Sequence, residues 1–144
     1  MNTDIAPGIT HTLSLCVNDR VLVGAFTPET SRGSGLPPVF DTAFMVGFME
    51  WACIEALQPY LEDGWKTAGT HVYLNHVSPS PAGMKITALV ELMQIEGRTL
   101  RFRVDCHDEC GLIGSGYHER TVIESRRLVA KTGKKVSTAA LIAA

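Results

Sequence analysis

The sequence of 144 residues contains no block of basic residues and carries almost no net charge. Thirteen Lys and Arg stand against fifteen Asp and Glu, which gives a formal net charge of −2 at pH 7. Many nucleic-acid-binding surfaces interleave aromatic residues with basic ones, and this sequence has no such segment. We therefore expect no nucleic-acid partner.

Long hydrophobic runs are also absent. The longest strongly apolar stretch is too short and too interrupted to cross a bilayer. The first residues, Met1-Asn2-Thr3-Asp4-Ile5, lack the charged and then apolar pattern of a secretory signal. The sequence thus predicts a cytoplasmic protein without a membrane partner.

The sequence contains only four cysteines, and they do not form the closely spaced pairs typical of metal sites. Cys16, Cys53, Cys106 and Cys110 are scattered, which is typical of reduced thiols in or near a core. His107 lies between the last two, but zinc sites usually have tighter pairs and a second pair elsewhere. We expect no metal and no cofactor.

The length fits one domain, residues 1–144, with a core that needs no disulfide or metal. Residues 1–10 and 131–144 lack a clear pattern, and we expect them to be loose termini. Residues 18–38 are rich in proline and glycine, which oppose regular structure. This region is either a lid over a pocket or a plain connection.

The most informative segment is the nearly all-apolar stretch 40–54, which predicts a buried helix from Thr42 to Leu61. Asp41 is suited to cap its start, and Asp63-Gly64 gives a stop signal. Glu50 is the one carboxylate in the middle of this stretch. Because a buried carboxylate must be paired, hydrogen-bonded or protonated, Glu50 requires an explanation.

Most of the other segments alternate in the manner of half-buried strands. The predicted strands are residues 12–17, 70–77, 85–93, 99–107 and 111–125. One strand, one long apolar helix and four strands joined by hairpins leave the helix a single sheet to pack against. We predict an α+β hotdog fold, in which an antiparallel sheet wraps around one central helix.

Several polar residues are candidates for a site, each with a simpler alternative. His76 falls on the apolar side of the predicted strand 70–77. It is either a core histidine hydrogen-bonded to backbone or a reactive histidine. Gly69 allows a close backbone approach or belongs to a turn. Arg120 could pair with Glu50, bind a substrate or remain a solvated surface residue. Together with Thr42, these residues place several reactive groups near one apolar layer.

These motifs resemble the fluoroacetyl-CoA thioesterase family. The resemblance rests on Phe44-Met45-Val46-Gly47, Met49-Glu50-Trp51-Ala52-Cys53, Pro59-Tyr60-Leu61-Glu62, Gly69-Thr70, His76, Ile113-Gly114-Ser115-Gly116 and His118-Glu119-Arg120. It extends from about Val39 to about Ile123. It implies a homodimeric hotdog acyl-CoA thioesterase with its active sites near the dimer interface.

The resemblance also implies roles for individual residues. The family's catalytic threonine, glutamate and histidine fall on Thr42, Glu50 and His76. Its substrate-contacting glycine and arginine fall on Gly69 and Arg120. Coenzyme A then enters as part of the substrate.

Two departures limit what the resemblance implies about the acyl group. The family closes its pocket with a hydrophobic lid containing phenylalanines, where this sequence has Gly33 and Leu36. Ala43 follows Thr42 where the family has glycine. We therefore infer thioester chemistry and do not infer the fluorinated substrate.

The hypothesis is a thioesterase that uses Thr42, Glu50 and His76, with Glu50 as nucleophile or as base for a water. A hotdog hydratase or dehydratase is a second interpretation, because that chemistry also uses a carboxylate and a histidine. A non-catalytic acyl-CoA-binding module is a third. The acyl group, and the choice between CoA and a carrier protein, remain open.

Overall fold

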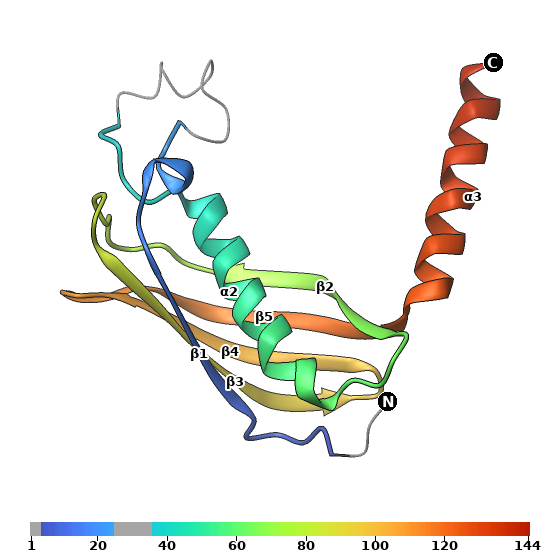
Figure 1. Ribbon diagram of the computed structural model, residues 1–144, viewed down its shortest axis with the longest axis horizontal. Helices are drawn as coiled ribbons and strands as arrows, with labels where there is room; N and C mark the ends of the chain where they lie inside the picture. The colour runs from blue at the N-terminus through green and yellow to red at the C-terminus, as the bar shows by residue number, and fades with distance from the viewer. Residues whose placement is uncertain (1–3, 25–35) are drawn as a thin grey trace.

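A curved antiparallel sheet holds one long helix on one of its faces. The computed structural model describes residues 4–24 and 36–144, and shows α2 lying obliquely across the sheet (Figure 1). The elements in chain order are β1 (Thr10–Cys16), η1 (Asp19–Val21), α2 (Thr42–Leu57), η2 (Gln58–Tyr60), β2 (Trp65–Leu74), β3 (Lys85–Glu96), β4 (Thr99–Asp108), β5 (Gly111–Glu124) and α3 (Ser125–Ala143). The predicted α+β arrangement of one sheet around a central helix is confirmed.

The strands are ordered β1-β3-β4-β5-β2, and all neighbours are antiparallel. The hairpins β3–β4 and β4–β5 form the centre of the sheet, while β1 and β2 form its edges. The two ends of the described sheet thus come from segments that flank α2 in the sequence. This order places the helix between its own flanking strands.

The core lies between α2 and the sheet. The inward side of α2 is fully apolar and is packed against the alternate, inward residues of β3 and β4. The core side chains of these elements are Met45, Met49, Ala52, Cys53, Leu57, Ile86, Ala88, Val90, Leu92, Leu100, Phe102, Val104 and Cys106, none of them exposed to solvent. The alternation predicted for β4 from the sequence is confirmed.

Two predictions about α2 need correction. The regular helix ends at Leu57, and a 3-10 turn containing Pro59 follows it, so the predicted end at Leu61 is too late. Asp41 stands at the N-cap, but its side chain makes no capping hydrogen bond. Its backbone N–H instead donates to the Val21 carbonyl at 2.8 Å, which ties the start of the helix to η1.

The predicted strand 70–77 is also shifted. β2 begins at Trp65 and ends at Leu74, so His76 lies beyond the strand. The chain still follows β5, because Asn75 N–H donates to the Ser115 carbonyl at 3.0 Å and Val77 N–H donates to the Ile113 carbonyl at 2.7 Å. His76 is therefore held in place by backbone bonds on both sides.

The glycines of β5 allow this close approach. A Cβ atom on Gly114 would meet the Asn75 carbonyl at 2.5 Å, and one on Gly116 would overlap the Tyr73 carbonyl. These two positions therefore permit a close backbone approach that a side chain would prevent. It is what brings the end of β2 against β5.

The C-terminal part of the chain differs from the expectation of a loose tail. Residues 131–144 belong almost entirely to α3, which stands away from α2 and from the sheet (Figure 1). The helix has no buried residue. The sequence analysis took residues 131–144 for a loose end, although their lysines and alanines favour a helix.

Candidate functional site

Thr42 and His76 form the first polar pair of the site. Thr42 opens α2, and its hydroxyl lies 2.7 Å from Nδ1 of His76. The ring of His76 also meets the edge of the buried Phe40 ring, with centroids 6.3 Å apart and an angle of 74° between planes. The helix start and the segment after β2 thus fix this imidazole from two sides.

The second nitrogen of His76 is the feature that indicates chemistry. Nε2 is buried and has no hydrogen-bond partner among the described residues. Burial lowers the pKa of His76, so the neutral ring is favoured near neutral pH. A neutral imidazole with an unpartnered nitrogen can accept or deliver a proton.

A cavity of about 240 Å³ adjoins this pair. Its lining is mostly apolar and consists of Val23, Leu36, Val39, Phe40, Thr42, His76, Val77, Ser78 and Pro79. The region predicted as a lid or connection, residues 18–38, contributes Val23 and Leu36 to the wall. Residues 25–35, including Gly33, lie outside the described part of the chain.

Glu50 belongs to a second cluster, further along α2. Oε2 of Glu50 accepts a hydrogen bond from Nη1 of Arg120 at 3.3 Å. The Glu50 side chain is 37% exposed, whereas Arg120 is 3% exposed. The carboxylate therefore reaches the surface of the single chain while its cationic partner stays inside.

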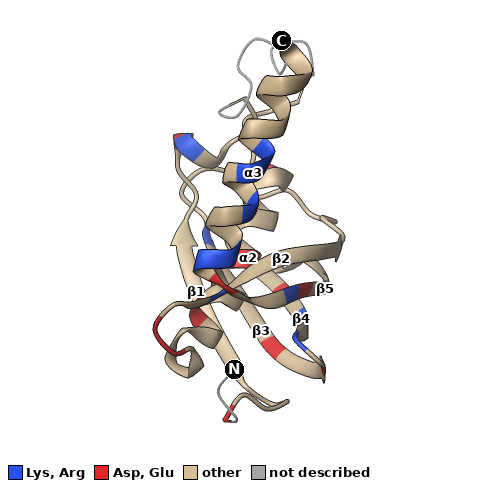
Figure 2. Cartoon of the chain, turned by 90° about the vertical axis from the view of Figure 1, so that its right-hand side faces the viewer, with Lys and Arg blue, Asp and Glu red and all other residues tan. Residues whose placement is uncertain are grey.

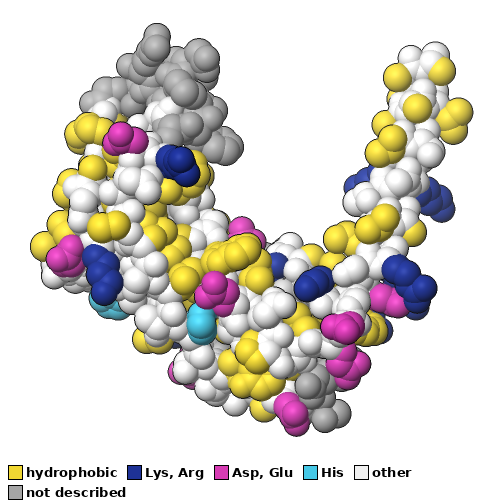
Figure 3. All heavy atoms as spheres, viewed as in Figure 1, with side chains coloured by type: hydrophobic (Ala, Val, Ile, Leu, Met, Phe, Trp, Pro, Cys, Tyr) yellow, Lys and Arg dark blue, Asp and Glu magenta, His cyan; other side chains and the backbone are white. Residues whose placement is uncertain are grey.

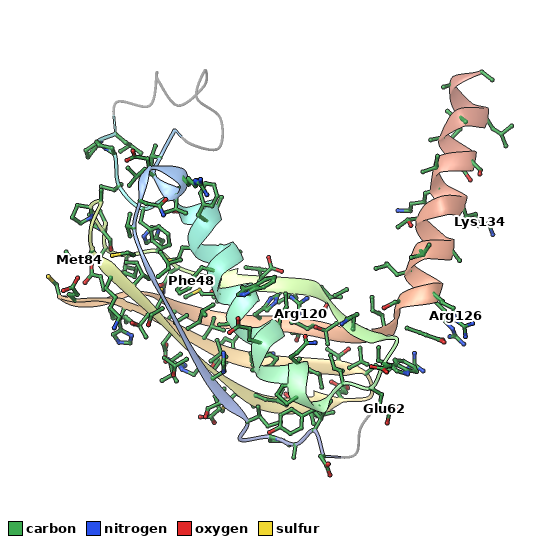
Figure 4. All side chains as sticks on the ribbon, viewed as in Figure 1. Phe48, Glu62, Met84, Arg120, Arg126 and Lys134 are labelled. Carbon is green, nitrogen blue, oxygen red and sulfur yellow. The ribbon has the colours of Figure 1, made fainter. Side chains whose placement is uncertain are left out.

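Arg120 is fully engaged by the protein. Its Nε donates to the Thr67 hydroxyl and its Nη2 to the Thr67 carbonyl, both at 2.8 Å. Burial lowers the pKa of Arg120, while the charge of Glu50 raises it, and the guanidinium remains protonated. In Figure 4 its side chain lies between α2 and the sheet. The sequence analysis left a solvated arginine open, and the structure excludes it.

His118 is the member that sequence reasoning missed. It is 1% exposed, its Nδ1 donates to the His71 carbonyl at 2.8 Å, and its Nε2 accepts from Nη1 of Arg120 at 3.1 Å. Burial lowers its pKa, in keeping with a neutral ring that accepts from a cation. The available signal was its alternation with Arg120 and Val122 on β5.

Gly69 lies against the side chains of Glu50, Arg120 and His118. A Cβ atom at this position would be 2.7 Å from Oε2 of Glu50, 3.2 Å from Nη1 of Arg120 and 3.3 Å from Cε1 of His118. The register of β2 with β5 also shifts just after Gly69. The absence of a side chain here is what leaves room for the carboxylate.

The predicted site residues therefore fall into two groups. The structure brings Thr42 to His76, and it brings Glu50 to Gly69 and Arg120. Thr42 and Glu50 are eight residues apart on α2, about 12 Å along the helix axis. Within one chain, the three predicted catalytic residues do not meet at one point.

The buried thiols near the site are unreactive. Burial raises the pKa of Cys53 to about 12, and the pKa of Cys106 also to about 12. Both therefore remain protonated near neutral pH. All four cysteines are free, and the described residues contain no cluster of three or more metal-binding side chains.

The fold and this set of residues define a class, the hotdog thioesterases. A structure of the fluoroacetyl-CoA thioesterase superposes with a TM-score of 0.86 at 40% identity, over 91% of this chain and 97% of that one. A thioesterase-superfamily protein of Thermus thermophilus shares the fold, with a TM-score of 0.83 at 24% identity over 94% and 96% of the two chains.

The family is shown more specifically by sequence. Residues 24–126 match the family of fluoroacetyl-CoA-specific thioesterases. The fluoroacetyl-CoA thioesterase of Streptantibioticus cattleyicolor is 45% identical over 108 residues, which cover 75% of this chain and 78% of that protein. The chain belongs to this family, as the sequence motifs predicted.

One further relative is informative about ligands. A variant of the fluoroacetyl-CoA-specific thioesterase, solved in complex with fluoroacetate and CoA, has a TM-score of 0.82 and 40% identity over 86% of this chain and 99% of that one.

Among the helices in the described residues, none is long and apolar enough to cross a membrane.

Proposed function

We propose that this protein is a homodimeric thioesterase that hydrolyses a small acyl-CoA to the free acid and CoA. The observation that carries the proposal is the buried, unpartnered Nε2 of His76 at the wall of an apolar cavity, in a chain of this family. The cavity volume suits a small acyl group. Relatives named for fluoroacetyl-CoA support the acyl-CoA class.

The dimer is proposed because each chain holds only parts of the site and exposes apolar surface beside them. One side of α2 carries Ala43, Gly47 and Trp51, all exposed, with Trp51 55% exposed. A helix that is apolar on all sides is expected to be covered. On the edge strand β2, Val72 and Tyr73 are also exposed. A second copy can cover both surfaces.

Pairing of β2 with β2 of a second copy would also join the two half-sites. Paired antiparallel about a two-fold axis between His71 and Val72, in the C-terminal half of the strand, each β2 places its Gly69 beside the far end of the partner strand. In one chain, Gly69 and Leu74 are about 16 Å apart along β2. In the dimer, the Glu50 group of one protomer then faces the Thr42–His76 pair of the other.

The chemistry assigned to this site is addition to the thioester carbonyl. The Gly69 N–H stabilises the developing oxyanion. Glu50 either attacks the carbonyl carbon, forming an anhydride, or takes a proton from the attacking water. In both routes the C–S bond breaks, a C–O bond to water oxygen forms, and one proton of that water ends on the sulfur.

His76 carries that proton. With Nδ1–H donating to the Thr42 hydroxyl, the lone pair of Nε2 is free to receive it and pass it to the thiolate. Thr42 holds the ring in place through this contact. Arg120 contacts Glu50 at 3.3 Å and has its remaining contacts on Thr67 and His118, so its role is to position the carboxylate.

The fluorinated substrate is not part of the proposal. Leu36 lines the cavity wall and Ala43 follows Thr42, at two places where the sequence departs from the family pattern. We also place the protein in the reducing cytoplasm, which its four free cysteines support. No metal or cofactor is assigned a role.

The test is release of free thiol from a panel of short, branched, aromatic and halogenated acyl-CoAs. The native protein should hydrolyse at least one of them. Glu50→Gln and His76→Ala should each fold and lose hydrolysis by at least about 100-fold. Glu55→Gln is the matched control, because Glu55 lies on the same helix but bonds to Trp51 and His11.

Full activity in Glu50→Gln or His76→Ala would overturn these assignments. A change in enoyl absorbance without thiol release would indicate a hydratase instead. Binding of acyl-CoA without turnover over the whole panel would indicate a binding module.

A further inference from the structure

Positive charge in this chain is concentrated on α3. Five of the thirteen Lys and Arg lie on this helix, which contains no Asp or Glu. The rest of the chain has eight basic against fifteen acidic residues and is therefore strongly acidic. Figure 2 shows the positions of the basic residues following one another along α3. A polyanionic ligand would be repelled by the body and attracted to this helix.

A pocket of about 180 Å³ lies at the base of α3. Its lining residues are Arg98, Ile123, Glu124, Arg127, Leu128 and Lys131. Three cationic side chains thus converge from two elements, the β3–β4 turn and α3. The one carboxylate, Glu124, is already paired, since its Oε2 lies 3.3 Å from Nε of Arg127.

Arg98 is fixed at this pocket by an aromatic ring. Its guanidinium carbon lies 5.4 Å from the centroid of the Trp65 ring, and its carbonyl accepts from the Val122 N–H at 2.9 Å. A stacked guanidinium keeps its N–H groups directed outward in the plane, which suits recognition of phosphate.

Strand β2 connects the pocket to the Glu50 group, because Trp65 of β2 contacts Arg98 and Gly69 of β2 lies against Glu50. Trp65, Thr67 and Gly69 alternate on β2, and Thr67 contacts Arg120, so Trp65 shares the side of the sheet on which Glu50 and Arg120 lie. From Gly69 to Trp65 the strand covers about 13 Å. CoA carries its phosphates at the far end of a long pantetheine arm, so thioester and phosphates must bind at separate places.

We propose that Arg98, Arg127 and Lys131 bind the phosphates of the CoA nucleotide while the thioester lies at Gly69. This inference rests on the proposed function. It adds the site that would distinguish an acyl group carried on CoA from the same acyl group on a thiol without the nucleotide. The hollow between α3 and the rest of the molecule, visible in Figure 3, gives the substrate a path along β2. A nucleotide-free thioester would lose these contacts.

The test compares two substrates with the same acyl group, an acyl-CoA and the acyl-pantetheine that lacks the nucleotide. Arg127→Gln/Lys131→Gln should raise KM for acyl-CoA by about tenfold or more and leave kcat unchanged. KM for acyl-pantetheine should not change. Arg98→Gln should act in the same direction, and rising salt should weaken acyl-CoA binding less in the variants than in the native protein.

The control is Arg101→Gln/Arg103→Gln. It removes the same charge from two exposed positions on β4, whose side chains alternate with the inward residues packed against α2 and so lie on the opposite face of the sheet. This variant should keep KM for acyl-CoA within about twofold of native. An equal rise in KM in both double variants would overturn the pocket, since it would indicate general attraction only.

Binding of CoA alone, followed by the fluorescence of Trp65 and Trp51 or by calorimetry, separates the inference from the thioesterase proposal. Weaker CoA binding in Arg127→Gln/Lys131→Gln supports the site even in a protein that hydrolyses no acyl-CoA tested. Unchanged CoA binding and an unchanged KM would overturn it while leaving the hydrolysis intact. The inference would also be overturned if Arg127→Gln/Lys131→Gln lost activity toward an acyl group on a carrier protein but kept native activity toward acyl-CoA.

Discussion

The backbone of Gly69 and the carboxylate of Glu50 lie too close together for any side chain to separate them. A Cβ atom on Gly69 would lie 2.7 Å from Oε2 of Glu50. The carboxylate is the mobile end of a flexible, partly exposed side chain, so it can yield where backbone could not. The contact therefore controls where Glu50 points more than whether the chain folds.

Gly69→Ala should separate activity from stability. The methyl group displaces the carboxylate from the thioester, and a misplacement of about 1 Å costs about 100-fold in rate. The free energy of unfolding should change by less than about 1 kcal/mol. Thiol release and urea unfolding measure the two quantities.

Gly133→Ala is the control for that substitution. Gly133 lies within α3 with no atom near its missing Cβ, so alanine should stabilise the helix by up to about 1 kcal/mol and leave kcat unchanged. A Gly69→Ala protein with native activity would show that Glu50 is not held for catalysis by this contact.

Arg120→Lys should be damaging although the charge is kept. A lysine cannot reproduce the fork that reaches Thr67, Glu50 and His118 together. We expect a loss of about 1–3 kcal/mol in the free energy of unfolding and at least a tenfold fall in kcat. Urea unfolding and thiol release again give both numbers.

Arg101→Lys is the surface comparison for Arg120→Lys. Arg101 is about half exposed, and its Nη1 lies 3.9 Å from Glu119. Its replacement should change stability by less than about 0.5 kcal/mol. Equal effects of the two substitutions would remove the special role assigned to Arg120.

Stability should depend in mildly acidic solution on two histidines, the half-buried His76 and the buried His118. Burial lowers the pKa of both His76 and His118 below the ordinary value of 6.5. The unfolded chain then binds more protons than the folded one as the pH falls below about 6.5, so the free energy of unfolding falls with it. The limiting slope is about 1.4 kcal/mol per pH unit for each histidine.

Asparagine at either position removes that titration. The slope of unfolding free energy between pH 6.5 and 5 should be smaller in His76→Asn and in His118→Asn, and smallest in the double variant. Chemical unfolding at several pH values provides the measurement. A double variant with the native slope would contradict the assignment.

The sequence predicted the fold well because its signals were periodic. β4 alternates cleanly, and the apolar stretch of α2 has few alternative structures. The boundaries of β2 were harder, since its residues pair with β5 through a register shift and close glycine contacts that no local pattern contains. α3 was missed because it has no buried residue, so no packing against the core marks it out from a frayed end.

The site was predicted less completely than the fold. The residue types came from the motifs, but their division into a Thr42–His76 pair and a Glu50–Arg120 pair depends on distances along one helix. His118 was overlooked because its importance comes from two contacts that the sequence does not mark. One is with the carbonyl of His71, which is distant in sequence, and the other is with Arg120, two residues along the same strand. Spacing on one chain also could not indicate whether one chain or two would form the site.

The division of the site leads to a test with mixed dimers. His76→Ala damages the Thr42–His76 half, and Glu50→Gln damages the other half. If each active site takes one half from each protomer, a mixed dimer contains one site with both halves intact and one with both halves damaged. Equal mixing of the two inactive proteins after unfolding and refolding should restore about a quarter of native thiol release.

Mixing Thr42→Ala with His76→Ala is the control, because both changes fall in the same half and no site can recover. The mass of the refolded species, measured by light scattering, verifies that dimers have formed. Recovery in the first mixture and none in the control would place the active site between protomers. Dimers that form without recovery in either mixture would mean that each protomer works alone, and Glu50 would then have to act on a substrate about 12 Å from Thr42 along α2.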